Sequence, residues 1–249
     1  MVVVEDAETL LKCYDEMETP DAPNLMLQEY IPGGSEMIWM FDGYFDDESE
    51  CLFGITGKKI RQYPPYSGVT SLGICVANDI VKRQTTDFMK AIGYRGILDL
   101  GYKYDARTDQ YKLLDVNPRI GTTFRLFVDT LGMDVARVLY LDLTGQSVLT
   151  GEPCEGRKWA VENFDLISSP TYCRDDKLNL WQWMRTYRGI EETAWFARDD
   201  LAPFFMMVWS SFRWASARLF AKVRKLLHYR SGSTRGGQLI RPGAVSKSM

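Results

Sequence analysis

The apolar and polar positions near the N-terminus predict a strand, a helix and a second strand. Residues 1–4 form an apolar run that we expect to be extended, and apolar residues then recur at helical spacing over residues 5–17. Residues 25–31 (LMLQEYI) predict another strand, which the Pro-Gly-Gly of residues 32–34 ends. A chain that begins in mid-strand is typical of the remainder of a longer domain.

Two hairpins are predicted farther along the chain. The first joins residues 36–45 to residues 50–56 around an acidic turn, and the second joins residues 96–104 to residues 110–116. Between them lies a stretch that begins with a basic segment and continues with glycine and serine, and we expect it to be a loop over residues 57–73.

Helical patterns at residues 79–92 and 134–144 complete the order of elements, and each ends at a glycine. Hairpins alternating with helices predict an α+β fold, an antiparallel sheet with flanking helices, followed by a helical C-terminal region. We expect three parts. They are a domain over residues 1–150, a helical and aromatic-rich extension over residues 151–230, and a disordered tail over residues 231–249.

The composition limits the kinds of catalytic and metal-binding sites that this chain can form from its own residues. The chain has 249 residues, 45% of them hydrophobic and 25% charged, which is ordinary for a globular protein. His228 is the only histidine, so a catalytic triad or a multi-histidine metal site would need a histidine from elsewhere. The five cysteines include no CxxC pair, which favours reduced thiols in a cytoplasmic protein over a zinc or redox motif.

Charge is unevenly distributed. The net charge of −3 gives no case for a nucleic-acid partner, but no acidic residue follows Asp200, whereas nine lysines and arginines do. Residues 201–227 begin with an apolar run too short to span a bilayer and continue with basic residues among aromatic ones. Such a segment is typical of a helix lying on a membrane surface, here the inner face. Packing on the acidic body of the chain, or an oligomer contact, is the alternative.

The second hairpin brings carboxylates together. If residues 105–109 form its loop, Asp99 lies opposite Asp115, and Asn117 points to the same face by the strand period. Two carboxylates and an amide oxygen are ligands that Mg²⁺ prefers, and Arg119 follows in position to meet an anion. The alternative is purely structural, because Asn-Pro commonly opens a turn at a strand end.

Four segments in order resemble the ATP-grasp enzymes, in particular the carboxylate–amine ligase branch. Residues 27–36 (LQEYIPGGSE) are similar to the family's hinge strand and ribose contact, and residues 59–64 (KIRQYP) to its basic strand. Residues 96–100 (GILDL) and 114–119 (LDVNPR) are similar to its two metal-bearing strands. The resemblance covers about residues 1–150.

The resemblance implies which residues would contact the nucleotide. Gln28, Glu29 and Ile31 would border the adenine, largely through backbone groups. Glu36 would bind the ribose hydroxyls, and Lys59 belongs to the basic strand beside the phosphates or the acceptor.

For the reaction, the resemblance implies that Asp99, Asp115 and Asn117 hold Mg²⁺, with Mn²⁺ as an alternative, against the phosphates of ATP. Arg61 and Arg119 would contact the phosphates, the acceptor carboxylate or the acyl-phosphate. The family activates a small-molecule carboxylate as an acyl-phosphate, which an amine or similar nucleophile then attacks. Phosphoryl transfer depends on positioning and charge neutralisation more than on a histidine base.

Family members also carry phosphate-contacting lysines and a flexible glycine-rich loop ahead of the hinge strand, and no residues of this sequence match them. We therefore expect the chain to be the C-terminal portion of such a ligase, with a separate N-terminal half as a candidate partner. The alternative is a non-catalytic remnant that binds nucleotide or associates with a membrane or a partner.

Overall fold

A computed structural model describes residues 2–19, 21, 24–175, 178–214 and 216–217. The chain divides into two compact units, Met1–Ala194 and Trp195–Met249. The first unit therefore extends beyond the boundary predicted at residue 150. The predicted disordered tail lies outside the described residues.

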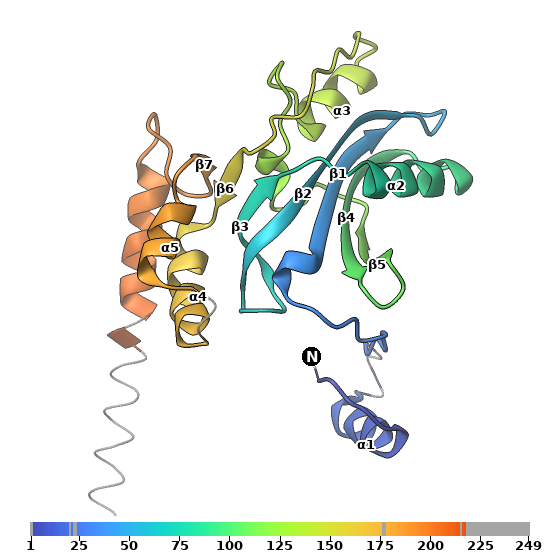
Figure 1. Cartoon of the computed structure of the whole chain (residues 1–249). Coiled ribbons are helices and arrows are strands. Elements are labelled where there is room, and N and C mark those ends of the chain that lie inside the picture. Colours follow the sequence, from blue (N-terminus) through green and yellow to red (C-terminus); the bar gives the residue numbers. More distant parts are fainter. Residues whose placement is uncertain (1, 20, 22–23, 176–177, 215, 218–249) are drawn as a thin grey trace, which may run out of the picture. The chain divides into compact units, whose positions relative to one another are not determined.

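The first unit is built on one seven-stranded sheet with the strand order β5-β4-β1-β2-β3-β6-β7 (Figure 1). Neighbouring strands are antiparallel except for β6 and β7, which pair in parallel. The strands are β1 (Ile38–Phe45), β2 (Cys51–Tyr63), β3 (Val69–Cys75), β4 (Gly96–Asp105), β5 (Gln110–Asn117), β6 (Lys158–Ala160) and β7 (Ile190–Thr193). The predicted α+β class with an antiparallel sheet is confirmed.

Five α-helices and two short 3₁₀ helices of the described residues carry labels: α1 (Ala7–Met17), η1 (Ser35–Met37), α2 (Asp79–Ala91), η2 (Phe124–Leu126), α3 (Val135–Leu143), α4 (Glu162–Arg174) and α5 (Leu180–Thr186). Residues 202–214 form one more helix, which we call the C-terminal helix. Within the described ranges, no helix combines the length and the hydropathy needed to cross a membrane.

Local chemistry explains where the predicted helices begin. Asn78 caps α2 by accepting hydrogen bonds from the backbone N–H groups of Ile80 and Val81, and Asp134 caps α3 through that of Arg137. Such caps satisfy backbone donors that have no partner inside the helix. The helices expected at residues 79–92 and 134–144 are therefore confirmed to within a residue or two.

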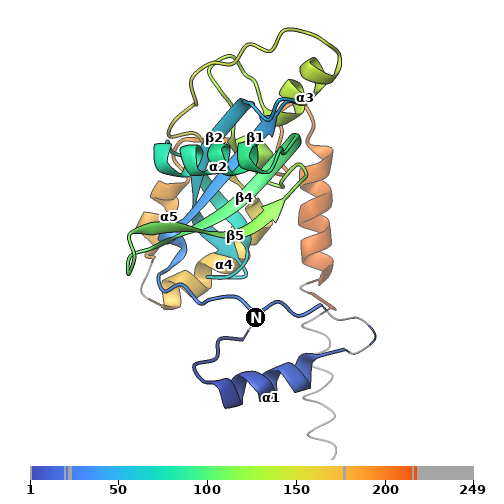
Figure 2. The same cartoon turned by 90° about the vertical axis from the view of Figure 1, so that its right-hand side faces the viewer.

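The strand alternation divides the core between the two faces of the sheet. On one face α2 packs across the strands, as Figure 2 shows, with Val81 and Met89 against Phe41. On the other face α3 and η2 pack over Tyr44 and Ile55. Burial of each large apolar side chain contributes roughly 1.5–3 kcal/mol, so both layers are needed to stabilise the sheet.

Three local predictions were wrong. Residues 57–63 continue β2 instead of forming a loop, because the charges there have partners: the ammonium of Lys58 lies 4.2 Å from the ring centre of Trp39. Residues 69–73 likewise belong to β3. Residues 2–4 and 25–31 form no strand, because their backbones pair with no neighbouring strand.

Candidate functional site

The second hairpin places three predicted metal ligands on one face of the sheet in a register different from the one we predicted. Asp105 pairs with Gln110, so the turn is one residue shorter than expected, and a bulge shifts the pairing once more. As a result Asp99 faces Asn117, and Asp115 lies two residues nearer the turn. The total slip of two residues keeps all three side chains on the same face, since side chains alternate with a period of two.

Glycines make room for the two carboxylates. Gly101 is the residue opposite Asp115, and a Cβ on it would lie 2.2 Å from Asp115 Oδ1. In the loop after β5, a Cβ on Gly121 would lie 2.2 Å from Asp99 Oδ2. Both carboxylates therefore occupy space that any other residue at these positions would fill.

The electrostatics of this cluster show carboxylates held close together in a partly buried place. Burial raises the pKa of Asp99 to about 6, and repulsion from Asp115 adds to the rise, while Lys59 and Arg119 oppose it. Burial also lowers the pKa of Lys59, against the attraction of the same two carboxylates. A cation beside Asp99 and Asp115 would relieve their repulsion.

Polar side chains continue the cluster into the loop after β5. Asn117 donates a hydrogen bond from Nδ2 to Asp115 Oδ2 over 2.7 Å, and Arg119 donates from Nη2 to Asn117 Oδ1 over 3.2 Å. A cation that took the oxygen of Asn117 would displace Arg119 from it. The guanidinium would then be available to an anion.

Asp42 is a member of this region that the sequence analysis missed. It lies on β1 directly opposite Asp99 and is fully buried, and among the described residues neither of its carboxylate oxygens has a hydrogen-bond partner. Burial raises its pKa well above the ordinary value, with Asp99 and then Asp134 adding to the effect. The signal in the sequence is a lone acid within the apolar run of residues 38–45.

The residues present suit a hard cation such as Mg²⁺. Asp99 and Asp115 supply carboxylate oxygens and Asn117 an amide oxygen, which is the ligand chemistry that Mg²⁺ prefers. No three side chains among the histidines, cysteines and acids of the described residues gather into a metal-binding group. Because the two carboxylates and the amide supply only some of the ligands that an octahedral Mg²⁺ needs, positions would remain for water and phosphate oxygens.

Arg61, predicted to contact phosphate or acceptor, is placed elsewhere. Its guanidinium binds Asp165 of α4 through two hydrogen bonds, of 2.6 and 2.8 Å, and donates a third to Thr186. Its side chain is 3% exposed. The structure therefore does not bring Arg61 together with Asp99 and Asp115, and its guanidinium is bound instead to Asp165 and Thr186.

Two of the residues predicted to contact the nucleotide, Gln28 and Glu29, interact with the second hairpin. Gln28 donates from Nε2 to the carbonyl of Leu114 on β5 over 2.9 Å. Glu29 forms ion pairs with Arg107 and Lys112 of the second hairpin.

Two more of the predicted nucleotide contacts, Ile31 and Glu36, lie just before β1. Ile31 is buried, and Glu36 accepts a hydrogen bond from the backbone N–H of Gly34. The segment that we expected to be the hinge strand contacts β5, at the edge of the sheet, through the side chains of Gln28 and Glu29.

Known proteins support the resemblance over part of the chain. No family model matches the sequence. The D-aspartate ligase of Enterococcus faecium (strain Aus0004) is 24% identical over 120 residues, which cover 47% of this chain and 28% of that ligase. This match supports the resemblance to the ATP-grasp ligases over that part of the chain. The chain spans less than a third of the length of this relative.

Among solved structures, N5-carboxyaminoimidazole ribonucleotide synthetase from Thermus thermophilus has a TM-score of 0.43 and 12% identity, covering 61% of this chain and 41% of that one. The phosphoribosylaminoimidazole carboxylase ATPase subunit from Aquifex aeolicus has a TM-score of 0.39 and 13% identity, covering 47% and 37%. Both TM-scores are below 0.5, and neither similarity carries an argument about the chemistry of this chain.

Proposed function

We propose that this chain supplies the metal- and phosphate-binding part of an ATP-dependent ligase that joins a carboxylate to an amine. The observation that carries the proposal is the cluster on one face of β4 and β5, where Asp99, Asp115 and Asn117 lie together. Lys59 and Arg119 are the cations whose charge acts on Asp99. The related D-aspartate ligase supports the class of reaction.

Each residue has a distinct task in this proposal. Asp99 and Asp115, with Asn117, would hold Mg²⁺ or Mn²⁺, which when bound neutralises charge on the phosphates of ATP. Lys59 supplies a fixed positive charge beside the carboxylates. Arg119, once released from Asn117, presents a planar guanidinium that suits two oxygens of a phosphate or carboxylate.

In the proposed reaction, an oxygen of the substrate carboxylate attacks the γ-phosphorus, and the bond to the β-phosphate oxygen breaks to release ADP. The amine then attacks the acyl carbon, and inorganic phosphate leaves. Since the relative is a D-aspartate ligase, we propose an amino acid as one of the two substrates. A cytoplasmic location and a separate N-terminal half stay predictions.

Nucleotide binding to the full chain tests the proposal. We expect calorimetry to detect ATP binding in the presence of Mg²⁺ and to lose it when a chelator removes the metal. Asp115→Ala should weaken Mg²⁺-dependent binding by about tenfold or more, because it removes one carboxylate ligand. Asp87→Asn, an exposed acid on α2, is the matched control and should bind like the parent chain.

The outcomes separate the proposal from its alternative. Absence of nucleotide binding at millimolar ATP and Mg²⁺ would remove it, and an unchanged metal dependence in Asp115→Ala would remove the metal assignment. Binding without release of ADP in the presence of amino acids would favour the non-catalytic nucleotide-binding alternative.

A further inference from the structure

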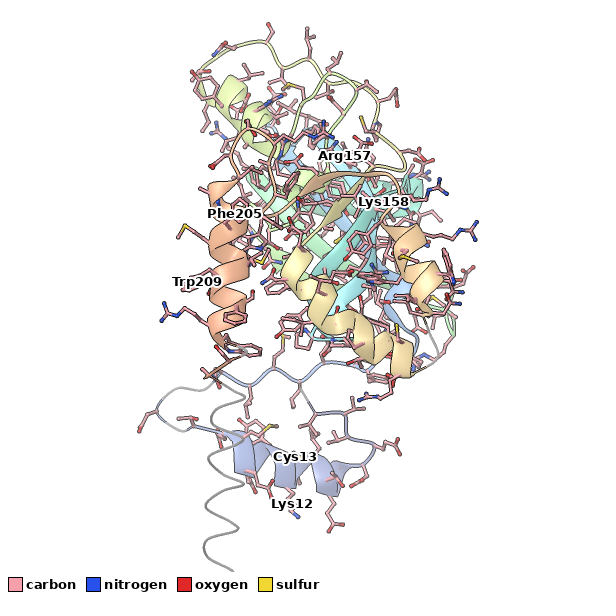
Figure 3. The ribbon with its side chains drawn as sticks, turned by 90° about the vertical axis from the view of Figure 1, so that its left-hand side faces the viewer. Lys12, Cys13, Arg157, Lys158, Phe205 and Trp209 are labelled. Atoms are coloured by element: carbon pink, nitrogen blue, oxygen red, sulfur yellow. The ribbon has the colours of Figure 1, made fainter. Side chains whose placement is uncertain are left out.

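The C-terminal helix exposes a stripe of large apolar side chains. Phe205, Val208, Trp209 and Phe212 are separated by three or four residues, so they lie along one side of the helix. Their exposed fractions are 64%, 46%, 64% and 66%. Figure 3 labels Phe205 and Trp209 on this helix. Met207 points to the opposite side and is buried.

Positive charge accompanies this stripe and continues beyond it. Arg213 follows the stripe directly on the same helix. No aspartate or glutamate follows Asp200, and the lysines and arginines of this part of the sequence are Arg213, Arg218, Lys222, Arg224, Lys225, Arg230, Arg235, Arg241 and Lys247. The aromatic stripe therefore lies at the start of a segment that carries nine positive charges and no negative ones.

We propose that the C-terminal helix docks on the surface of a bilayer containing anionic lipid. Phe205, Trp209 and Phe212 would enter the boundary between headgroups and acyl chains, where aromatic side chains are favoured. The basic residues that follow would meet the anionic headgroups. The stripe runs along one side of the helix, which suits a helix lying in the membrane surface, while Met206 and Trp214 are exposed apolar side chains outside it.

Charge also argues against the rival occupant, a second copy of this chain. A second copy bound through its own stripe would bring the same segment, which carries nine positive charges and no acid, and so would add no complementary charge from that segment. A surface of phosphatidylserine supplies the missing negative charge. Anionic lipid therefore matches both features of the segment, whereas self-association matches only the apolar one.

Vesicle flotation with the full chain tests this proposal. We expect the chain to float with vesicles of phosphatidylcholine and phosphatidylserine, and to stay behind with phosphatidylcholine alone or at high salt. The triple variant Phe205→Ser, Trp209→Ser, Phe212→Ser should lose about tenfold or more of its affinity, because three buried aromatic contacts disappear. Trp181→Ser, at an exposed tryptophan of α5, is the matched control and should float normally.

Two further measurements keep the result interpretable. Circular dichroism of the triple variant should match the parent chain, since the substituted side chains are exposed. The milder variant Trp209→Ser, which should bind measurably less, replaces it if the triple variant unfolds. Arg213→Gln should weaken flotation more at low salt than at high salt.

A parent chain that fails to float with anionic vesicles would overturn the proposal, as would substituted variants that float as well as the parent. Size-exclusion chromatography without lipid covers the remaining case. A parent dimer that the triple variant converts to a monomer, together with no flotation, would assign the stripe to a second copy instead. Mg·ATP binding should be the same in all these variants, so a failure here is distinct from a failure of the proposed ligase function.

Discussion

Asp165 on α4 and Asp42 on β1 are both fully buried carboxylates of the first unit, yet their surroundings are opposite. Asp165 accepts six hydrogen bonds, two of them from Arg61 and the others from Ser71, Ser169, Trp183 and Tyr187. The carboxylate of Asp42 accepts no hydrogen bond from the described part of the chain, and it lies opposite a second acid, Asp99. The comparison separates a buried carboxyl group whose oxygens are satisfied by hydrogen bonds from a buried carboxyl group whose oxygens have no partner among the described residues.

The two carboxyl groups also respond to pH in opposite directions. Burial alone would raise the pKa of Asp165, but the hydrogen bonds and charge of Arg61 outweigh burial and hold the pKa below its ordinary value of 3.8. The stabilisation from Asp165 is therefore present above pH 3.8 and is lost as pH falls below it. Asp42 has a raised pKa, so its folded form retains a proton that the unfolded chain releases, and the stability decreases as pH rises above 3.8.

The largest expected effect on the free energy of unfolding comes from breaking the ion pair between Arg61 and Asp165. Arg61→Met should lower the free energy of unfolding by about 3–5 kcal/mol, because it leaves Asp165 buried without its counter-charge. Urea denaturation monitored by tryptophan fluorescence measures this change. Arg83→Met, at an exposed arginine of α2, should change it little. A loss in Arg61→Met no greater than in this control would show that Arg61 is not structural.

Substitution of Asp42, whose carboxylate has no hydrogen-bond partner among the described residues, should stabilise the fold instead. Asp42→Asn should raise the free energy of unfolding by about 1–3 kcal/mol near neutral pH, because the amide needs no proton to stay neutral in a buried place. The gain should shrink as pH falls towards 3.8, where the unfolded carboxyl is itself protonated. Urea titrations with a chelator present, at several pH values, give the curve. A destabilised variant at neutral pH would contradict the comparison.

A smaller effect on stability, but a clear one on metal binding, is expected from Gly101→Ala. The new methyl group would meet Asp115 Oδ1, which is the free end of a side chain and can move aside. We therefore expect a thermal midpoint close to that of the parent and a weaker Mg²⁺ dependence of ATP binding. Gly156→Ala is a control glycine whose added Cβ would meet no atom within 4 Å, although its positive φ adds some strain of its own.

The smallest effect is expected from charges that water already solvates. Glu29 is 56% exposed and pairs with Arg107 and Lys112, which hold its pKa below the ordinary value. Glu29→Gln should leave the thermal midpoint unchanged within error, since exposed pairs contribute little. A large drop would mean that these surface pairs fix the segment before β1 more firmly than their exposure suggests.

Much of the architecture could be predicted from the local pattern of apolar and polar residues. The alternation around the acidic turn defined the first hairpin, and Asn78 and Asp134 marked the starts of α2 and α3. The shared face of Asp99, Asp115 and Asn117 was also predictable although their register was not, because a slip of two residues leaves every side chain on its original face.

Other features depended on contacts between distant parts of the chain. The first part of β2 was predicted as a strand, but the basic residues 57–63 indicated a loop, and only folding brought Asp165, 104 residues away, to Arg61. The segment expected to be a strand at residues 25–31 contacts the edge strand β5 through side chains, such as Gln28 on the carbonyl of Leu114, without pairing its backbone.

By itself, the sequence determined the two hairpins, the starts of α2 and α3, the shared face of the candidate ligands, and the division between an acidic body and a basic C-terminal segment, since these follow from short-range periodicity and composition. Only the tertiary structure decided which charges are satisfied. Arg61 found a partner and Asp42 did not, because hydrogen-bond partners come from elements far apart in the chain, and no local pattern encodes their distance.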